Sequence, residues 1–331
     1  MESSVRERSA ITLEGFVLGE ALVWGTLCLA AVGVDTPRLD AECLLAFLFN
    51  SDRLSLYSRL TEPLTPDVRD RYRDLIARRE NRMPVAYLTG VKEFWSLPLR
   101  VTPAVMIPRP ETEILVEAAL THLRRMLRLH GTGRRRSSRS LLVADVGTGS
   151  GAIAIALARE LPEIQCYATD ISWEACEVAQ ENARAHGVAA RITFLEGDLL
   201  QPLFARCLQG RLDLLISNPP YIPTSLLKLL SPEVQHEPRL ALDGGPDGLA
   251  YHRRIIAEAP DLLRPGGSLL LEIDPEQAGP VTRLLQDHGA FADVATVPDL
   301  SGRNRVIIAR CVGSGFMVHS SEMISTMNNT P

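Results

Sequence analysis

The chain lacks the features of a membrane or secreted protein. An apolar stretch near the amino terminus, residues 21–34, is too short to span a bilayer and follows Glu20. The first twelve residues mix charged and polar side chains, acids included, which differs from a secretory signal. We therefore expect a cytoplasmic protein without a membrane segment.

Cysteine is sparse, and positive charge is not in excess. The six cysteines have no close pairing spacing and no Cys/His cluster resembles a metal site, so we expect free thiols in a reducing compartment and no bound metal. Lys and Arg number 35 against 40 Asp and Glu, a net charge of -5. Proteins that bind duplexes neutralise many phosphates with basic side chains. This balance argues against a stable nucleic-acid partner, although it leaves room for a small basic patch.

Length and patterning predict two domains. The 331 residues, 46% hydrophobic, are enough to bury a sizeable core. Residues 1–85 carry helical patterns only, which predicts a helical bundle. Glycine, proline and β-branched residues predict a β-hairpin connector over 86–110. Strand and helix patterns then alternate over 111–311, as in a doubly wound, mostly parallel α/β sheet.

Apolar runs predict seven strands in this second domain, at 140–146, 164–169, 192–195, 212–216, 267–273, 292–297 and 305–310. Only a short loop separates the last two, so we expect them to be antiparallel neighbours. The ends of the central strands carry Gly147, Asp170, Asp198 and Asn218. Ligands of such sheets bind outside the carboxyl ends of the strands, and we expect one here.

The most informative motif is Asn218-Pro219-Pro220-Tyr221, directly after a predicted strand. An Asn side-chain oxygen and a backbone carbonyl can each accept one N–H of a planar NH2 group, which orients its nitrogen for attack on an electrophile. Proline stiffens the turn, and the tyrosine ring offers a face to the planar group. The alternative is a rigid turn without chemistry.

A glycine-rich turn supports the first interpretation. Gly147-Thr148-Gly149-Ser150-Gly151 joins a predicted strand to a predicted helix, so its backbone can approach a ligand closely. The spacing differs from the Gly-x-Gly-x-x-Gly of pyrophosphate-binding folds and favours a nucleoside ligand without a diphosphate.

Two acids follow the next strands. Asp170, nineteen residues after Gly151, is placed to accept both hydroxyls of a ribose, and Asp198 to meet an adenine amino group. A lone Asp after a strand is more often a helix cap. Two acids in register with a glycine loop favour binding.

Two segments fall outside the pattern. Residues 124–140 contain seven arginines, and we interpret them as a solvated basic loop, with an acidic partner surface as the alternative. Residues 312–331 are polar without periodicity, which predicts a disordered tail.

From about residue 39 to 310 the chain resembles the release factor glutamine methyltransferases of the HemK/PrmC type. The tetrad alone is shared with methyltransferases that act on amino groups of DNA and RNA bases. Its combination with Ile107-Pro108-Arg109-Pro110-Glu111-Thr112-Glu113 is specific. Further matching segments, in family order, are 38–42, 84–90, 93–95, 145–151, 237–238, 243–249 and 302–306.

The resemblance implies a class I S-adenosylmethionine-dependent methyltransferase: a Rossmann-like, seven-stranded sheet with an antiparallel last strand, preceded by a small all-α domain. It implies methyl transfer from S-adenosylmethionine, leaving S-adenosylhomocysteine, to the side-chain N5 of the glutamine in the Gly-Gly-Gln motif of class I peptide chain release factors. It also implies a monomer and a partner-binding role for the helical domain.

The resemblance also implies roles for single residues. The methionine part of the cofactor would border Asp145 and the loop Gly147, Thr148, Gly149, Ser150 and Gly151, its ribose Asp170, and its adenine Asp198 and Leu199. Asn218 would also contact the cofactor. The glutamine amide would meet Asn218, Pro219, Pro220 and Tyr221, with Arg109 and Thr112 in the wall near the reacting centre. For Arg109 and Thr112 a purely structural role is an equal alternative. Phe94 and Trp95 are expected to fill core rather than to cover the cofactor.

Other functions remain as alternatives. A DNA or RNA adenine N6-methyltransferase would use the same clamp on a flipped base, but it predicts a basic groove. A nicotinamide oxidoreductase is disfavoured by the glycine spacing, and a non-catalytic scaffold by the intact clamp.

Overall fold

The computed structural model describes residues 15–131 and 140–313. They form two compact units. The first takes in the chain up to Val91 together with Val101–Pro103 and Leu230–Glu237, and the second takes in Lys92–Arg100, Ala104–Leu229 and the chain from Pro238 onward. Residues 314–331 of the predicted tail and 132–139 of the arginine-rich segment lie outside the described residues.

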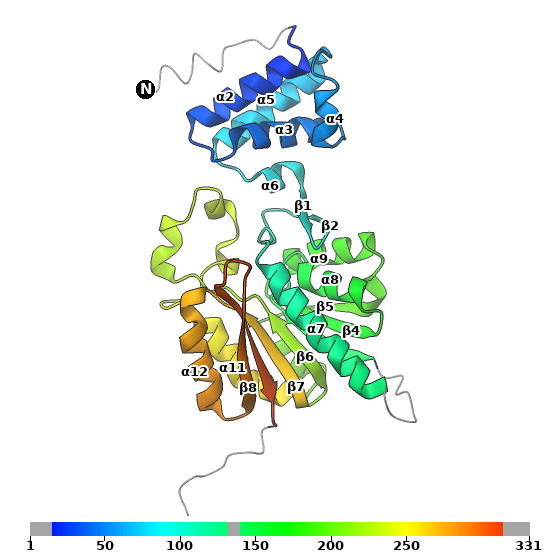
Figure 1. Cartoon of the computed structure of the whole chain (residues 1–331), viewed down its shortest axis with the longest axis vertical. Coiled ribbons are helices and arrows are strands. Elements are labelled where there is room, and N and C mark those ends of the chain that lie inside the picture. Colours follow the sequence, from blue (N-terminus) through cyan, green and yellow to red (C-terminus); the bar gives the residue numbers. More distant parts are fainter. Residues whose placement is uncertain (1–14, 132–139, 314–331) are drawn as a thin grey trace, which may run out of the picture. The chain divides into compact units, whose positions relative to one another are not determined.

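The first unit is helical, as its sequence pattern predicts (Figure 1). Its helices are α2 (Leu18–Ala31), α3 (Pro37–Leu48), α4 (Arg53–Tyr57), α5 (Pro66–Glu80) and α6 (Val85–Thr89). The apolar stretch 21–34 supplies much of the core, where Leu22 and Leu29 pack with Leu44 and Tyr72. No helix in the described ranges is long and apolar enough to cross a membrane.

A buried ion pair ties the helices of this unit to a segment far along the chain. The Arg79 side chain is only 6% exposed, and its Nε and Nη2 donate to Asp40 Oδ2 at 2.7 Å and Glu233 Oε1 at 2.8 Å. Glu233 Oε2 also accepts from Arg82 Nη2 at 3.0 Å. Segment Leu230–Glu237, which contains η3 (Val234–His236), therefore belongs with the helices.

The second unit contains a hairpin and the large sheet. The hairpin is β1 (Val91–Phe94) and β2 (Leu97–Arg100), within the predicted connector. Phe94 is 1% exposed in the core and Trp95 packs against that core, which confirms their predicted role.

All seven predicted strands are present. They are β3 (Leu141–Val146), β4 (Ile164–Asp170), β5 (Ile192–Glu196), β6 (Leu212–Ser217), β7 (Leu263–Glu272), β8 (Phe291–Pro298) and β9 (Asn304–Cys311). Their order is β5-β4-β3-β6-β7-β9-β8, and the last strand in sequence, β9, is antiparallel to both β7 and β8. This is the Rossmann-like, seven-stranded α/β fold expected.

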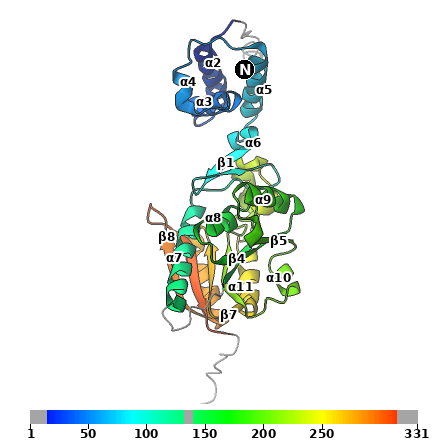
Figure 2. The same cartoon turned by 90° about the vertical axis from the view of Figure 1, so that its right-hand side faces the viewer.

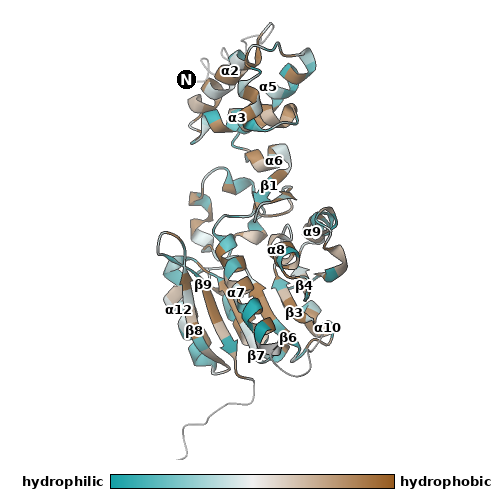
Figure 3. Ribbon diagram, turned by 45° about the vertical axis from the view of Figure 1, so that its right-hand side comes forward, coloured by the Kyte–Doolittle hydropathy of each residue, from teal (hydrophilic) through white to brown (hydrophobic). Residues whose placement is uncertain are grey.

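Helices cover both faces of the sheet (Figures 1 and 2). Successive strand residues alternate between the two layers. Val143 and Leu214 pack in one core, with α7 (Thr112–Gly131) and α8 (Ala152–Glu160). Ala144 and Leu215 pack in the other, with α11 (Ala250–Leu262) and α12 (Ala278–His288). The apolar strands are brown between the helices in Figure 3. The helices are α7 (Thr112–Gly131), α8 (Ala152–Glu160), α9 (Trp173–Ala185), α10 (Gln201–Ala205), α11 (Ala250–Leu262) and α12 (Ala278–His288), with short turns η1 (Ala189–Arg191), η2 (Thr224–Leu229), η4 (Arg239–Ala241) and η5 (Pro275–Gln277).

The arginine-rich segment corrects one expectation. Residues 124–131 are the last part of helix α7 and not a loop. The cause is an apolar stripe, since Leu123 and Met126 are buried against the sheet and hold this part of the helix in place. Arg124 on the same turns pairs with Glu160 Oε2 at 2.7 Å.

We predict that Arg79→Ala destabilises the helical unit by about 3 kcal/mol, because the change leaves Asp40 buried without its cation. The matched control is Arg78→Ala, since the Arg78 side chain is 48% exposed and lies 3.9 Å from Asp74. Chemical unfolding followed by circular dichroism measures both. Equal stabilities of the two variants would contradict the assignment.

Candidate active site

The ends of three neighbouring strands form one ledge. Val146 of β3 pairs with Thr169 of β4 on one side and with Ser217 of β6 on the other. The residues that follow, Gly147, Asp170 and Asn218, therefore lie side by side at this edge of the sheet. This brings together three residues that the sequence placed at predicted strand ends.

Buried hydroxyl groups fix this ledge. Ser217 Oγ donates to the Val146 carbonyl at 2.7 Å, and Thr169 Oγ1 donates to the Leu199 carbonyl at 2.9 Å. The Thr169 carbonyl accepts from the backbone N–H of Gly147 and of Thr148 at 2.8 and 2.9 Å. Each bond joins one strand end to a neighbouring strand end or to the loop that follows it, which stabilises the ledge.

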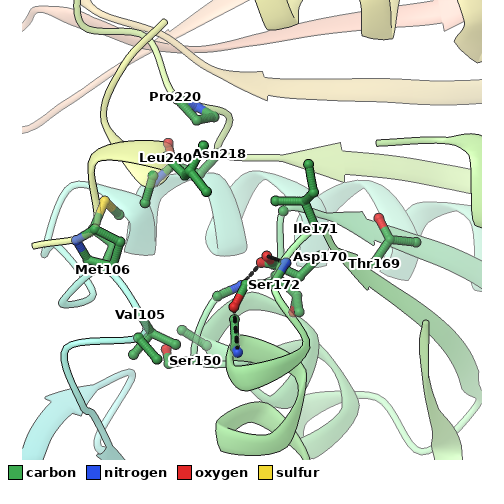
Figure 4. A pocket seen from close by; sticks show the side chains of 18 of the residues that line it. Val105, Met106, Ser150, Thr169, Asp170, Ile171, Ser172, Asn218, Pro220 and Leu240 are labelled. Carbon is green, nitrogen blue, oxygen red and sulfur yellow. Dashed lines mark hydrogen bonds between the residues drawn. The ribbon is translucent and has the colours of Figure 1, made fainter. Parts of the chain in front are cut away.

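A cavity of about 430 Å³ opens above the ledge (Figure 4). Most of the sequence-predicted site residues line it, namely Thr112, Gly147, Thr148, Gly149, Ser150, Asp170, Asp198, Leu199, Asn218 and Pro220. Asp145, Gly151, Arg109, Pro219 and Tyr221 are not among the lining residues.

Gly151 supports the loop from behind the cavity. Its φ is +81°, and a Cβ there would lie 2.9 Å from Ile155 Cδ1 and 3.1 Å from Ala179 Cβ. Only glycine therefore lets the loop turn into α8 this close to α9. The loop closes on Asp170, whose Oδ2 accepts from the Gly149 N–H at 2.8 Å.

Asp145 also acts from beneath the loop. It is fully buried, and its Oδ2 accepts from Thr148 Oγ1 at 2.7 Å and from the Ala154 N–H at 3.2 Å, while Oδ1 is buried without a hydrogen bond. Burial raises the pKa of Asp145 to about 7, although the two hydrogen bonds lower it. Asp145 shapes the loop and has no surface on the cavity.

The two acids that the sequence predicts to bind a nucleoside, Asp170 and Asp198, already have hydrogen-bond partners. Asp170 Oδ1 accepts from the Ser172 N–H at 3.0 Å, and burial raises its pKa. Asp198 Oδ2 accepts from Arg254 Nη2 of α11 at 2.6 Å. Because each carboxylate oxygen has two lone pairs, both acids can still accept hydrogen bonds from a ligand.

At the other end, the Asn218 side chain has a defined orientation. Its Nδ2 donates to Thr112 Oγ1 at 3.1 Å, so the amide oxygen points away from Thr112. Figure 4 shows Asn218 on the cavity wall with Pro220 and Leu240. The Tyr221 hydroxyl donates to Glu272 Oε1 at 3.5 Å, and burial and then the charge of Glu272 raise the pKa of Tyr221.

Several residues that line the cavity are not among those predicted from the sequence. The apolar wall includes Val105, Met106, Ile171 and Leu240, and Arg254 closes the cavity beside Asp198. Ile171 had a readable signal, because it is an apolar residue directly after the strand-end acid and is 54% exposed. The others come from segments distant in sequence. The described residues contain no group of three or more His, Cys, Asp or Glu suited to a metal ion.

Comparison with known proteins decides the family. The sequence matches the PrmC N-terminal domain over residues 20–90 and the Methyltransferase small domain over residues 134–228. A release factor glutamine methyltransferase from Moorella thermoacetica is 48% identical, covering 88% of this chain and 98% of the relative. One from Geobacter sulfurreducens is 42% identical, covering 90% and 98%.

The chain belongs to the release factor glutamine methyltransferase family. Among solved structures, the hMettl16 catalytic domain in complex with a MAT2A 3'UTR hairpin resembles it with a TM-score of 0.50 and 17% identity, covering 71% of this chain and 81% of that one. At this identity the likeness shows the methyltransferase fold alone.

The buried Asp145 makes stability depend on pH. Its pKa is higher in the folded chain than in the unfolded one, so protonation of Asp145 adds to the free energy of unfolding at low pH. This contribution is lost as pH rises to about 7. We predict that Asp145→Asn abolishes this part of the dependence. Relative to the parent, the variant should gain about 3 kcal/mol of unfolding free energy between pH 5 and 8.

Urea unfolding at the two pH values measures the difference. Glu177→Gln, at an exposed acid on α9, is the control and should track the parent at both. A constant difference between Asp145→Asn and the parent at pH 5 and 8 would show that Asp145 titrates normally.

Proposed function

We propose that this chain transfers a methyl group from S-adenosylmethionine to the side-chain amide nitrogen, N5, of the glutamine in the Gly-Gly-Gln motif of class I peptide chain release factors. Full-length relatives that carry this activity in their names support it. The geometric observation that carries it is the Asn218 amide, whose NH2 is bound to Thr112 and whose oxygen is thereby left for a substrate.

The cavity has the chemistry that the cofactor requires. The glycine loop offers backbone to a polar amino-acid moiety, Asp170 and Asp198 offer acceptors to a ribose and an adenine amino group, and Ile171 and Leu199 are apolar neighbours for a flat base. When bound, the cofactor supplies a methyl group on a positively charged sulfur, which is already a good leaving group.

The chain's own residues then have to hold the acceptor. An amide nitrogen attacks poorly because its lone pair is delocalised, so orientation is the main requirement. The Asn218 oxygen and the Pro219 carbonyl would accept the two N–H groups of the glutamine amide, with Tyr221 against the amide plane. Both acceptors bind more tightly as the nitrogen gains positive charge, so they favour the transition state over the ground state.

The helical unit is proposed to bind the release factor. The predicted domain 1–85 overlaps the match to the PrmC N-terminal domain over residues 20–90, which lies outside the match to the Methyltransferase small domain. Exposed apolar side chains on this unit, Val23, Leu27, Leu54 and Tyr57, are available for a protein partner. We expect the enzyme to act as a monomer in the cytoplasm.

The relatives do not favour the alternative adenine N6-methyltransferase. The matching names specify release factor glutamine, and the likeness to an RNA-bound catalytic domain is one of fold. An Asn-Pro-Pro-Tyr clamp recognises a planar NH2 in either case, so the substrate has to be tested directly.

The test uses purified protein, radiolabelled S-adenosylmethionine and three acceptors: a class I release factor, its Gln→Ala variant at the Gly-Gly-Gln tip, and duplex DNA. We expect label in the first acceptor alone. Label in DNA, or equal label in both release factor forms, would overturn the proposal.

For the clamp, we predict that Asn218→Ala lowers turnover roughly a hundredfold, because one transition-state hydrogen-bond acceptor is lost. Binding of S-adenosylhomocysteine, measured by calorimetry, should change only a few-fold. Turnover within a few-fold of the parent would show that this side chain is not the clamp.

For the nucleoside end, we predict that Asp170→Asn weakens cofactor binding at least tenfold, since the amide cannot accept from both ribose hydroxyls and the Gly149 N–H. Glu196→Gln is the control, because Glu196 ends the next strand, is exposed and does not line the cavity. Equal affinities of the two variants would place the ribose elsewhere.

A further inference from the structure

We propose that Glu272, the last residue of β7, is a positioning residue that determines which end of the Asn218 amide faces the cavity, acting through the hydroxyl of Thr112. The inference rests on the proposed function, in which Asn218 has to present its oxygen to a substrate NH2. Glu272 lies outside the Asn-Pro-Pro-Tyr tetrad and does not line the cavity.

The three side chains meet from three different elements. β6 and β7 are parallel neighbours with Ser217 opposite Leu271, so Asn218 and Glu272 are the next residues at adjacent strand ends. Thr112 begins α7 and is 4% exposed, while Glu272 is 1% exposed. The Thr112 hydroxyl is a hydrogen-bond donor to the Glu272 carboxylate and the acceptor for Asn218 Nδ2 at 3.1 Å.

A hydroxyl group has one proton, and that fixes the direction of the chain of bonds. An ionised carboxylate can only accept, so Thr112 gives its proton to Glu272 and has only lone pairs left for Asn218. Asn218 must then turn its NH2 toward Thr112. Its oxygen is thereby directed to the opposite side, where a glutamine NH2 needs an acceptor.

The same carboxylate also supports the second clamp side chain. Tyr221 donates its hydroxyl proton to Glu272 Oε1 at 3.5 Å, while Glu272 Oε2 is buried without a hydrogen bond. A buried, incompletely satisfied carboxylate destabilises the fold, and an apolar residue in its place would not. Its presence is explained if it orients Asn218 and Tyr221 together.

The charges around Glu272 determine when it is ionised. Burial raises the pKa of Glu272 to about 7, whereas the Thr112 hydrogen bond and the positive charge of Arg305 on β9 lower it and Glu111 raises it. From α11, the His252 ring contacts the Glu272 backbone carbonyl and not the carboxyl group. Burial lowers the pKa of His252, so that ring stays neutral near pH 7.

Protonation would reverse the chain of bonds. A neutral Glu272 can donate its proton to the Thr112 oxygen. The Thr112 hydroxyl can then donate to Asn218, whose amide oxygen would rotate toward Thr112 to accept. The NH2 of Asn218 would face the substrate NH2, donor against donor. Methyl transfer should therefore require ionised Glu272 and should rise with pH through about 7.

The test compares Glu272→Gln, Thr112→Val and their double variant with the parent. The amide introduced by Glu272→Gln would keep the volume but supply a donor to Thr112 at every pH. We expect kcat to fall at least tenfold in each single variant, the step near pH 7 to vanish in E272Q, and the affinity for S-adenosylhomocysteine to change less than threefold. Because the residues act in one chain, the double variant should be no slower than the slower single variant.

Two further variants separate orientation from general damage. Thr112→Ser restores the hydroxyl and should recover most of the turnover lost in Thr112→Val. Asp213→Asn removes another buried acid, 1% exposed at the start of β6, and should retain the step near pH 7. A parent-like kcat and pH profile in E272Q, or costs that multiply in the double variant, would overturn the proposal.

A measurement that does not depend on activity distinguishes the test of this proposal from the test of the proposed function. In protein bound to S-adenosylhomocysteine, the side-chain 15N signal of Asn218 should shift with a midpoint near pH 7 in the parent and stay constant in E272Q. If the parent fails to methylate a release factor, the proposed function fails, yet this titration still supports or refutes the role of Glu272. A flat Asn218 signal in the parent would refute it.

Discussion

The parallel register of β4, β3 and β6 is the constraint on which the site depends. It aligns Thr169, Val146 and Ser217, so that the loops beyond them emerge at one level. A slip of one residue would turn the inward side chains of a strand to its other face and separate the glycine loop from Asn218. The buried hydroxyls of Thr169 and Ser217, bonded to neighbouring backbone, favour the single correct alignment.

Two buried acids, Asp145 and Glu272, lie behind the wall of the cavity and do not line it. The cavity wall is largely apolar around a loop of glycine backbone, an environment that would strengthen hydrogen bonds to the proposed glutamine amide. Asp145 and Glu272 lie behind this wall, fully desolvated, each with one oxygen that has no hydrogen bond. Burying these two carboxylates lowers the stability of the fold. Neither acid touches the cavity, but Asp145 is hydrogen-bonded to Thr148 and Glu272 to Thr112, and both of these residues line it.

Features encoded within a few neighbouring residues could be predicted from the sequence. The seven strands, the loop ending at Gly151 and the strand-end residues Asp170 and Asn218 all follow from local pattern. Features that depend on distant contacts could not. Glu272 resembles the end of any buried strand until the fold brings Thr112, 160 positions earlier, to its side chain. Likewise, nothing near Glu233 indicates that it pairs with Arg79 in the helical unit.

The central claim is that two oxygen acceptors at the end of β6 immobilise a glutamine side chain beside the methyl donor. A crystal structure with S-adenosylhomocysteine and a Gly-Gly-Gln peptide tests it most directly. The account predicts that the glutamine NH2 lies within hydrogen-bonding distance of the Asn218 side-chain oxygen and the Pro219 carbonyl, with its nitrogen facing the cofactor sulfur. A glutamine amide bound away from both acceptors, or an Asn218 amide with its nitrogen toward the substrate, would contradict it.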